Sequence, residues 1–205
     1  MWLSDDRRMG EATAPGFLDL LPATPPRQDH VILREITPAD VALALELATD
    51  AYVPLIGTLP AHASPEQALD WIDRQRGERL AQRQGLTFAI AEADTDRAVG
   101  HIGLWLAELR HGRATAGYSV GPSARGRGIA AAALIALTRF AWTIPGLHRI
   151  ELHIEPWNVA SVRTAERAGY RREGLLRSHQ EIGGERRDML IYAAIRSDDA
   201  HRNPD

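Results

Sequence analysis

The sequence predicts an α/β protein, in the narrower sense α+β, with one mixed central β-sheet. Segments typical of strands alternate with segments typical of helices along most of the chain. One of them, HRIELHIEP at 148–156, alternates strictly between polar and apolar residues, as a strand with one buried face does. The 205 residues, 44% of them hydrophobic, are enough to bury a sizeable core within one domain.

Capping residues mark the helix starts in the first half of the chain. Thr37 and Ser64 each precede a proline, which is typical of an N-cap followed by the first helical position. A glutamine three residues after Ser64 completes a capping box. These patterns predict helices over 41–52 and 64–82. Apolar runs bounded by turn-like residues predict strands at 30–36, 86–93 and 98–109.

The same alternation continues in the second half. Strands and helices are predicted there in turn, at 114–120, 128–142, 148–156 and 158–170. The segments 169–179 and 186–195 flank the turn-like sequence IGGE and are predicted to pair as the last two strands.

The two ends of the chain differ in character from the middle. Residues 1–29 are rich in proline and show little periodicity, and residues 197–205 are mostly polar. We therefore expect an N-terminal extension over 1–29, one folded domain over 30–196 and a tail over 197–205.

Composition excludes several classes of protein. The net charge of −3 and the pI near 6.2 provide no global basic field, so neither nucleic acid nor a membrane is expected as a partner. The absence of cysteine excludes disulfides, thiolate metal sites and cysteine nucleophiles, and no metal is expected. The first ten residues lack the apolar core of a signal peptide, and the longest apolar stretch, 128–142, is broken by Arg139. A cytoplasmic protein is expected.

A glycine-rich, basic turn joins the strand at 114–120 to the following helix. Its residues are Arg125, Gly126, Arg127, Gly128, Ile129 and Ala130. Unpaired N–H groups at a helix start attract anions, glycines let a phosphate approach the backbone, and arginines pair with phosphate oxygens. The turn therefore predicts a phosphate site, although a plain surface turn has the same composition. It is not a nucleotide P-loop, because no Gly-Lys-Ser/Thr follows.

A second motif follows the strand at 148–156. Asn158 lies one helical turn before Ser161, and Ala168-Gly169-Tyr170 closes the helix. In this order and spacing the two motifs resemble those of the GNAT acetyltransferase superfamily, over about residues 30–195. The later segment 172–177, with Asp188 and Tyr192, is similar to the branch that contains the ribosomal-protein N-terminal (alanine/serine) acetyltransferases.

The resemblance implies a sheet that splays between its fourth and fifth strands, flanked by about four helices. It implies acetyl-CoA as cosubstrate, with the pantetheine arm in the splay, against Ser119 and Val120, and the pyrophosphate on the N–H groups of 126–130. The Asn158 amide would bind the pantetheine arm. As a helix N-cap, Asn158 has an equally good structural explanation.

The reaction implied is direct attack of a primary amine on the thioester. The Val120 N–H is the expected oxyanion donor. Many family members protonate the departing thiolate with a tyrosine, but Ala165 stands at that position. Ser161, which matches the serine of the N-terminal acetyltransferase branch, is the expected substitute, unless its hydroxyl bonds back into its own helix.

The general base is harder to place. The glutamate usual before the Gly-Tyr of the fourth strand is missing from Thr115-Ala116-Gly117-Tyr118. The position that the branch gives to an acidic residue falls on Gln180, with Glu181 beside it. Glu181 is the expected base, through a water or a one-residue shift; it also fits a solvated turn residue. His101 and His153 are further candidates, although a single histidine in a strand is more often structural.

The resemblance points to a protein or peptide N-terminal α-amine as acceptor. A small amine metabolite or an antibiotic satisfies the same chemistry. The missing tyrosine and glutamate leave open a second alternative, a non-catalytic acetyl-CoA-binding regulator that has lost turnover. An RNA-associated module built on the RG pairs is disfavoured by the charge and by the lack of aromatic-basic interleaving. The expected assembly is a monomer or a homodimer.

Overall fold

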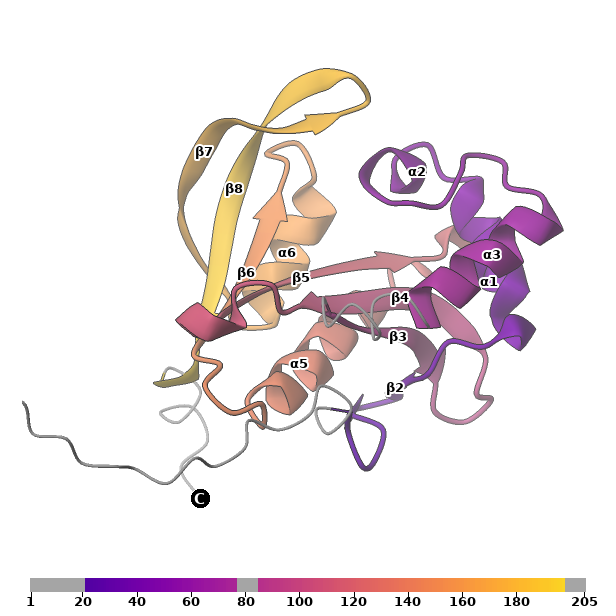
Figure 1. Ribbon diagram of the computed structural model, residues 1–205, viewed down its shortest axis with the longest axis horizontal. Helices are drawn as coiled ribbons and strands as arrows, with labels where there is room; N and C mark the ends of the chain where they lie inside the picture. The colour runs from indigo at the N-terminus through magenta and orange to yellow at the C-terminus, as the bar shows by residue number, and fades with distance from the viewer. Residues whose placement is uncertain (1–20, 77–84, 198–205) are drawn as a thin grey trace, which may run out of the picture.

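The computed structural model describes residues 21–76 and 85–197 (Figure 1). Within these residues, eight strands form one sheet in the order β1-β2-β3-β4-β5-β6-β8-β7. The strands are β1 Arg27–Gln28, β2 Val31–Arg34, β3 Gly85–Glu92, β4 Ala98–Trp105, β5 Arg113–Val120, β6 Arg149–Ile154, β7 Arg171–Ile182 and β8 Glu185–Ile195. The helices are α1 Val41–Ala48, α2 Val53–Ile56, α3 Pro65–Arg76, α5 Ile129–Ala141 and α6 Val159–Arg167.

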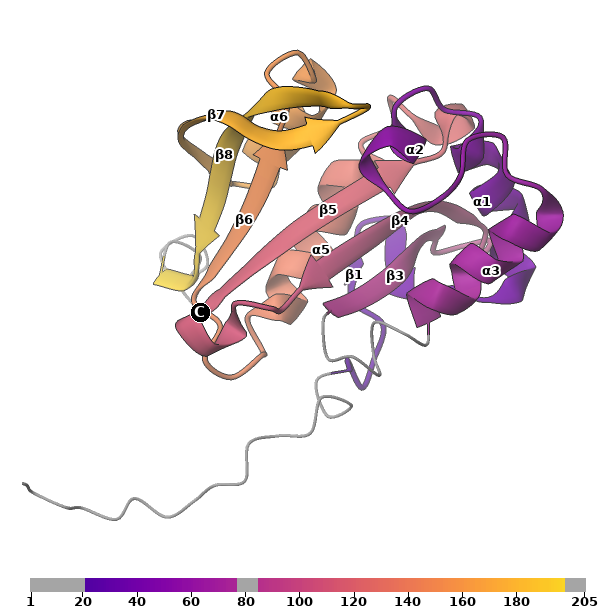
Figure 2. The same ribbon diagram turned by 45° about the horizontal axis from the view of Figure 1, so that its top comes forward.

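The sheet splays between β5 and β6, as the resemblance implied (Figure 2). These two strands run parallel and pair only from Arg113 with Arg149 to Thr115 with Glu151. Beyond that point β5 stays paired with β4, and β6 with β8, up to the ends of the strands. Each strand therefore keeps one partner while its other edge faces a gap that widens toward the carboxyl ends.

Two helical layers cover the sheet. The alternation along β3 separates them, because Phe88 and Ile90 pack with α5 whereas Ala89 packs with α1 and α3. Small side chains on α5, among them Ala133 and Ala136, are almost fully buried and let this helix approach the sheet closely. Among the described helices, none is long and apolar enough to cross a membrane.

One predicted helix is divided in two. The helix expected over 41–52 ends at Ala48, and the Asp50 carboxylate then accepts hydrogen bonds from the backbone N–H groups of Tyr52 and Val53 at 2.8 and 2.9 Å. Satisfying these donors starts a new helical turn, α2, in a different direction. The described residues therefore contain five α-helices where about four were expected.

The other predicted helix starts where its cap indicates. The Ser64 N–H donates to Gln67 Oε1 at 2.9 Å and the Gln67 N–H donates to Ser64 Oγ at 3.2 Å, which confirms the capping box. The described part of this helix ends at Arg76, and the rest of the predicted range lies outside the described residues.

Candidate active site

The backbone of β5 presents hydrogen-bonding groups to the splay. Val120 lies opposite Gly100 on β4, and the Gly121 N–H donates to the Val99 carbonyl at 2.9 Å. Because backbone groups alternate in direction along an antiparallel strand, this pattern turns the Val120 N–H and C=O away from β4 and toward β6. Ser119 has the opposite orientation, with its backbone directed at His101 of β4. The structure thus brings the backbone of Val120, and not that of Ser119, to the gap.

The glycine-rich turn leads directly into α5. Gly126 and Gly128 both have φ +77°, a left-handed conformation that favours glycine. Gly128 is the N-cap of α5 and contributes no side chain, and the Ala132 N–H donates to its carbonyl at 3.1 Å. The N–H groups of Ile129 and Ala130 precede this first helical bond. A Cβ on either glycine would meet nothing within 4 Å, so the helix start is open to a ligand.

The two arginines of the turn point back to carboxylates. Arg125 Nη2 lies 2.6 Å from Asp50 Oδ2, and its Nε donates to the Val120 carbonyl at 3.0 Å. Arg127 Nη2 lies 2.8 Å from Glu92 Oε1. Burial alone would raise the pKa of Asp50, but backbone N–H groups and Arg125 hold it below its usual range. The phosphate contacts expected of these guanidinium groups therefore compete with ion pairs, whereas the N–H groups of the helix start do not.

Asn158 and Ser161 face the splay from α6. Asn158 Oδ1 accepts a hydrogen bond from the Ser161 N–H at 3.1 Å, so Asn158 is the N-cap of α6. Tyr118 of β5 reaches across the gap and donates its hydroxyl to the Ser161 carbonyl at 3.3 Å. Burial raises the pKa of Tyr118. The sequence motif thus brings Ser161 to the gap, and the structure adds a second hydroxyl beside it, which sequence reasoning did not single out.

The three residues expected as bases lie on three different strands. Glu181 is exposed on the β7–β8 hairpin, opposite Arg186. His101 is buried with its ring 5.1 Å from that of Trp71 on α3. His153 on β6 is half-buried, and burial and the neighbouring His179 lower its pKa.

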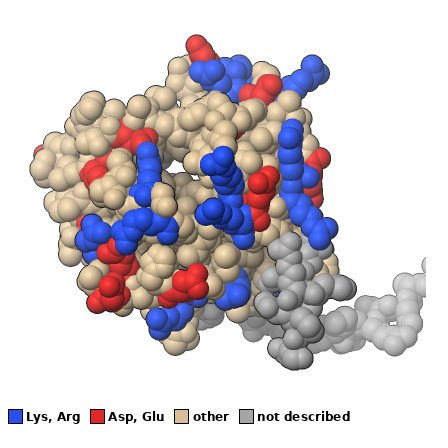
Figure 3. Space-filling view, turned by 180° about the vertical axis from the view of Figure 1, so that it is seen from behind, with Lys and Arg blue, Asp and Glu red and all other residues tan. Residues whose placement is uncertain are grey.

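The hairpin that carries Glu181 reaches over to the helical layer. A Cβ on Gly183 at its tip would lie 3.7 Å from Leu55 Cδ1 of α2, and Figure 2 shows the tip beside this helix. The tip and α2 together therefore border the open end of the splay. Figure 3, which views the molecule from behind, shows a hollow with basic side chains on both sides of it.

A carboxylate that sequence reasoning missed lies at this open end. Glu155 directly follows β6, and its side chain is 3% exposed. Tyr52 at the start of α2 stands beside it, and its ring lies 4.9 Å from that of Trp157. Burial, and then the carboxylate of Glu155, raise the pKa of Tyr52. The polar-apolar alternation of β6 was a signal for Glu155, but nothing in the sequence indicated Tyr52 as its neighbour.

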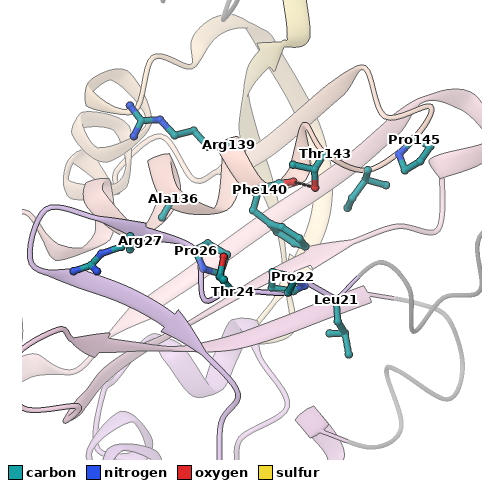
Figure 4. Close-up of a pocket in the computed structure, with 12 residues that line it drawn as sticks. Leu21, Pro22, Thr24, Pro26, Arg27, Ala136, Arg139, Phe140, Thr143 and Pro145 are labelled. Carbon is teal, nitrogen blue, oxygen red and sulfur yellow. Dashed lines mark hydrogen bonds between the residues drawn. The ribbon is translucent and has the colours of Figure 1, made fainter.

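One pocket in the described part of the chain lies away from the splay. Its volume is about 540 Å³, and it separates residues 21–27 from the C-terminal half of α5 (Figure 4). Phe140 and Arg139 of α5 line it, with Thr24 and Pro26 opposite. It is at the other end of α5 from the glycine-rich turn and contributes no residue to the splay. Among the described residues no group of three His, Asp or Glu side chains is placed to hold a metal ion.

Comparison with known proteins gives a consistent result. A family model described as "Acetyltransferase (GNAT) domain" matches residues 30–171. A Bacillus subtilis protein described as "Probable N-acetyltransferase YjcK" is 33% identical over 124 residues, which cover 60% of this chain and 68% of that protein. YoaA of Bacillus subtilis, described as an uncharacterized N-acetyltransferase, is 27% identical over 82% of this chain and 94% of its own. The structure of Mycobacterium smegmatis RimJ in complex with CoA-disulfide superposes with a TM-score of 0.71 and 28% identity, covering 85% of this chain and 87% of that one.

Proposed function

Since the chain belongs to the GNAT acetyltransferase family and is an N-acetyltransferase that uses acetyl-CoA, we propose that it acetylates the N-terminal α-amine of a protein or peptide. The observation that carries the proposal is the contact between Tyr118 and Ser161 across the splay, which brings two hydroxyl-bearing residues together there. The fold that contains this splay superposes on that of RimJ. A Vibrio cholerae protein described as a "putative ribosomal-protein-serine acetyltransferase", the branch that the sequence motif resembles, superposes on 85% of this chain with a TM-score of 0.67 and 25% identity.

The coenzyme is proposed to bind where the structure leaves backbone groups available. The N–H groups of residues 126–130 would hold the pyrophosphate, because they open on an empty surface at the positive end of the α5 dipole. The Val120 backbone would hydrogen-bond the pantetheine arm or the thioester carbonyl. Asn158 keeps its amide nitrogen for the same arm, since its oxygen already caps α6.

The chemistry proposed for the site needs no covalent enzyme intermediate. The acceptor nitrogen attacks the thioester carbonyl, and the oxyanion that develops is stabilised by the Val120 N–H. The carbon–sulfur bond then breaks, and the Ser161 hydroxyl gives its proton to the departing thiolate. Glu181 was the base expected from the sequence; its exposed position on the hairpin requires a water to relay the proton.

The test is acetyl transfer to matched peptides, followed by coenzyme A release and by mass. Each peptide exists in two forms, one with a free N-terminus and no lysine, the other with a blocked N-terminus and an internal lysine. We expect turnover of the first form only. Turnover of small amines or aminated antibiotics, with no transfer to peptides, would show that the acceptor is a small amine and not a peptide N-terminus. Binding of acetyl-CoA without turnover of any amine would favour the regulator. The chain contains no lysine, so its own side chains add no amine background.

A further inference from the structure

We infer that Glu155 accepts the proton of the acceptor amine, and that Tyr52 and Trp157 hold the apolar group next to that amine. The inference rests on the proposed function. It assigns a general base, and a preference for an apolar group next to the amine, to the open end of the splay, outside both sequence motifs. The acceptor class it specifies is an N-terminal α-amine whose first side chain is aromatic or aliphatic.

Glu155 and Val120 lie at matching positions on the two strands that border the gap. β5 and β6 separate after Thr115 and Glu151, so Glu155 is four residues beyond the last pair on one strand and Val120 is five residues beyond it on the other. At about 3.3 Å per residue the two reach the same height on opposite sides of the gap. Glu155 also belongs to the polar face of β6, because Ile150, Leu152 and Ile154 pack in the core with α5. The acceptor and the coenzyme would thus approach from opposite faces of the sheet.

The Glu155 carboxylate is almost completely buried, so its charge needs partners. A carboxylate that is 3% exposed is stable only with a cation or several donors around it. The ion pair with Arg187 is long, at 3.7 Å between Nε and Oε1, and Arg187 Nη2 is held by Glu185 at 2.6 Å. Glu155 also hydrogen-bonds with the Tyr52 hydroxyl, but its ion pair with Arg187 is long for such a buried carboxylate. An ammonium group entering the gap would complete its environment.

Partly exposed apolar side chains lie near Glu155 at the open end of the splay. The rings of Tyr52 and Trp157 meet edge to face at 4.9 Å, and Trp157 remains 59% exposed. Leu55 on α2 is 52% exposed and lies beside the hairpin tip, where a Cβ on Gly183 would be 3.7 Å from its Cδ1. These three side chains surround the entrance to Glu155 with uncovered apolar surface. A substituent beside the amine would cover that surface, and an aromatic face also attracts the ammonium group.

The proposed proton transfer balances the acetyl transfer. The ammonium group of the acceptor gives one proton to the Glu155 carboxylate, which passes it to water. The neutral nitrogen forms the new bond to the acetyl carbon, and the carbon–sulfur bond breaks. The second nitrogen proton leaves after attack by the same route, while Ser161 protonates the sulfur and recovers its proton from water. The products are the N-acetyl amide and coenzyme A thiol, with one proton released to solvent.

The first experiment compares Glu155→Gln, Glu155→Asp and Arg187→Gln, using tripeptides that begin with phenylalanine or serine. We expect Glu155→Gln to lower kcat at least about a hundredfold, which is the usual range for loss of a general base. The rising acid limb of the kcat–pH profile should disappear with it, acetyl-CoA affinity should stay the same, and Glu155→Asp should restore part of the rate. Arg187→Gln removes the same ion pair from the other side and should change kcat by less than about fivefold.

The second experiment tests the aromatic pair with Trp157→Ala, and with Leu69→Ala as a control. Leu69 is also exposed, at 37%, but lies on α3. We expect Trp157→Ala to raise KM for the phenylalanine peptide about tenfold or more, with little change for the serine peptide, and Leu69→Ala to change neither.

The possible outcomes separate the inference from the proposed function. If the wild-type enzyme acetylates peptides but Glu155→Gln keeps its rate and acid limb, Glu155 is not the base and the inference fails alone. Equal losses in Glu155→Gln and Arg187→Gln would also overturn it, since the ion pair would then be structural. If no peptide is acetylated while a small amine is, the proposed acceptor fails, and Glu155→Gln can still be scored with that amine.

Discussion

The Tyr118 hydroxyl donates a hydrogen bond to the Ser161 carbonyl at 3.3 Å, and this contact joins β5 to α6 across the splay. Both residues therefore place a hydroxyl at the gap in which the coenzyme sulfur is proposed to lie. They differ in their hydrogen bonding, because the proton of the Tyr118 hydroxyl is already donated to the backbone. This difference makes Ser161 the better candidate for the acid and gives a direct way to compare the two.

Replacing Ser161 by alanine should lower kcat more than it raises KM for acetyl-CoA. The hydroxyl is needed as the thiolate develops and contributes little to ground-state binding. Steady-state kinetics at saturating acceptor measure both constants. Tyr118→Phe is the matched variant, and it should lower kcat by less than about tenfold. A larger kcat loss in Tyr118→Phe than in Ser161→Ala would assign the acid to Tyr118. A change confined to KM would make Ser161 a binding contact.

Replacing Gly128 by aspartate should weaken acetyl-CoA binding at least about a hundredfold, near 3 kcal/mol. The new carboxylate would stand at the helix start where the pyrophosphate is proposed to bind. Isothermal titration gives the dissociation constant, and circular dichroism checks the fold.

Gly146→Asp is the control for Gly128→Asp. Gly146 has φ +78°, nearly the same as Gly128, and a Cβ there also meets nothing within 4 Å. It adds the same charge and the same backbone strain away from the glycine-rich turn. An unchanged dissociation constant in folded Gly128→Asp, or an equal loss in Gly146→Asp, would contradict the loop assignment.

The preferred acceptor should be an amine of low pKa, such as an α-amine. At pH 7.5 an α-amine with a pKa near 7.7–8.0 is substantially neutral, whereas about one lysine in a thousand is, given its pKa near 10.4. A carboxylate is a weak base toward the amine molecules that are still protonated at this pH. The kcat/KM profile should rise with the pKa of the free acceptor and move when the acceptor is changed.

Glu181→Gln should reduce the rate by less than about tenfold, because Glu181 is exposed on the hairpin and Glu155 is inferred to take the proton of the acceptor. Profiles in kcat/KM that stay near pH 6–7 for every amine, or efficient turnover of internal lysines, would show a stronger base than any carboxylate named above.

Replacing Asp40 by asparagine should destabilise the fold by about 2–4 kcal/mol at pH 7, because it breaks a buried ion pair. Asp40 is 6% exposed, and its two oxygens accept hydrogen bonds from Arg34 Nη1 and Nη2 at 2.8 Å each. Burial alone would raise the pKa of Asp40, but Arg34 and the Thr37 backbone hold it below its usual value.

The sign of the pH dependence follows from the lowered pKa of Asp40. Its stabilising contribution is complete above the unfolded pKa of about 3.9 and is lost as the pH falls through the lower folded pKa. Urea unfolding should therefore show a wild-type advantage over Asp40→Asn that shrinks below about pH 4. Asp96→Asn removes the other, exposed partner of Arg34 and should cost less than about 1 kcal/mol. Equal losses in the two variants would rule out burial as the cause.

Local patterns in the sequence determined most of the fold and one half of the site. Period, capping and glycine placement are properties of neighbouring residues, so they predicted the strands, the Ser64 capping box and the turn at Gly126 and Gly128. The two motifs likewise placed Asn158 at a helix start and Ser161 one turn beyond it.

Tertiary structure alone decided which distant groups meet. Asp50 ends one predicted helix and pairs with Arg125, a contact between residues 75 positions apart in the sequence. Tyr52 comes to lie beside Glu155 because α2 reaches the open end of the splay. Such pairs leave no periodic signal, since the energy that forms them comes from packing between elements and not from the local chain. The sequence therefore determined the glycine-rich turn and the helix start at Asn158, where the coenzyme is proposed to bind, and the packing of α2 against the end of β6 decided the side proposed for the acceptor.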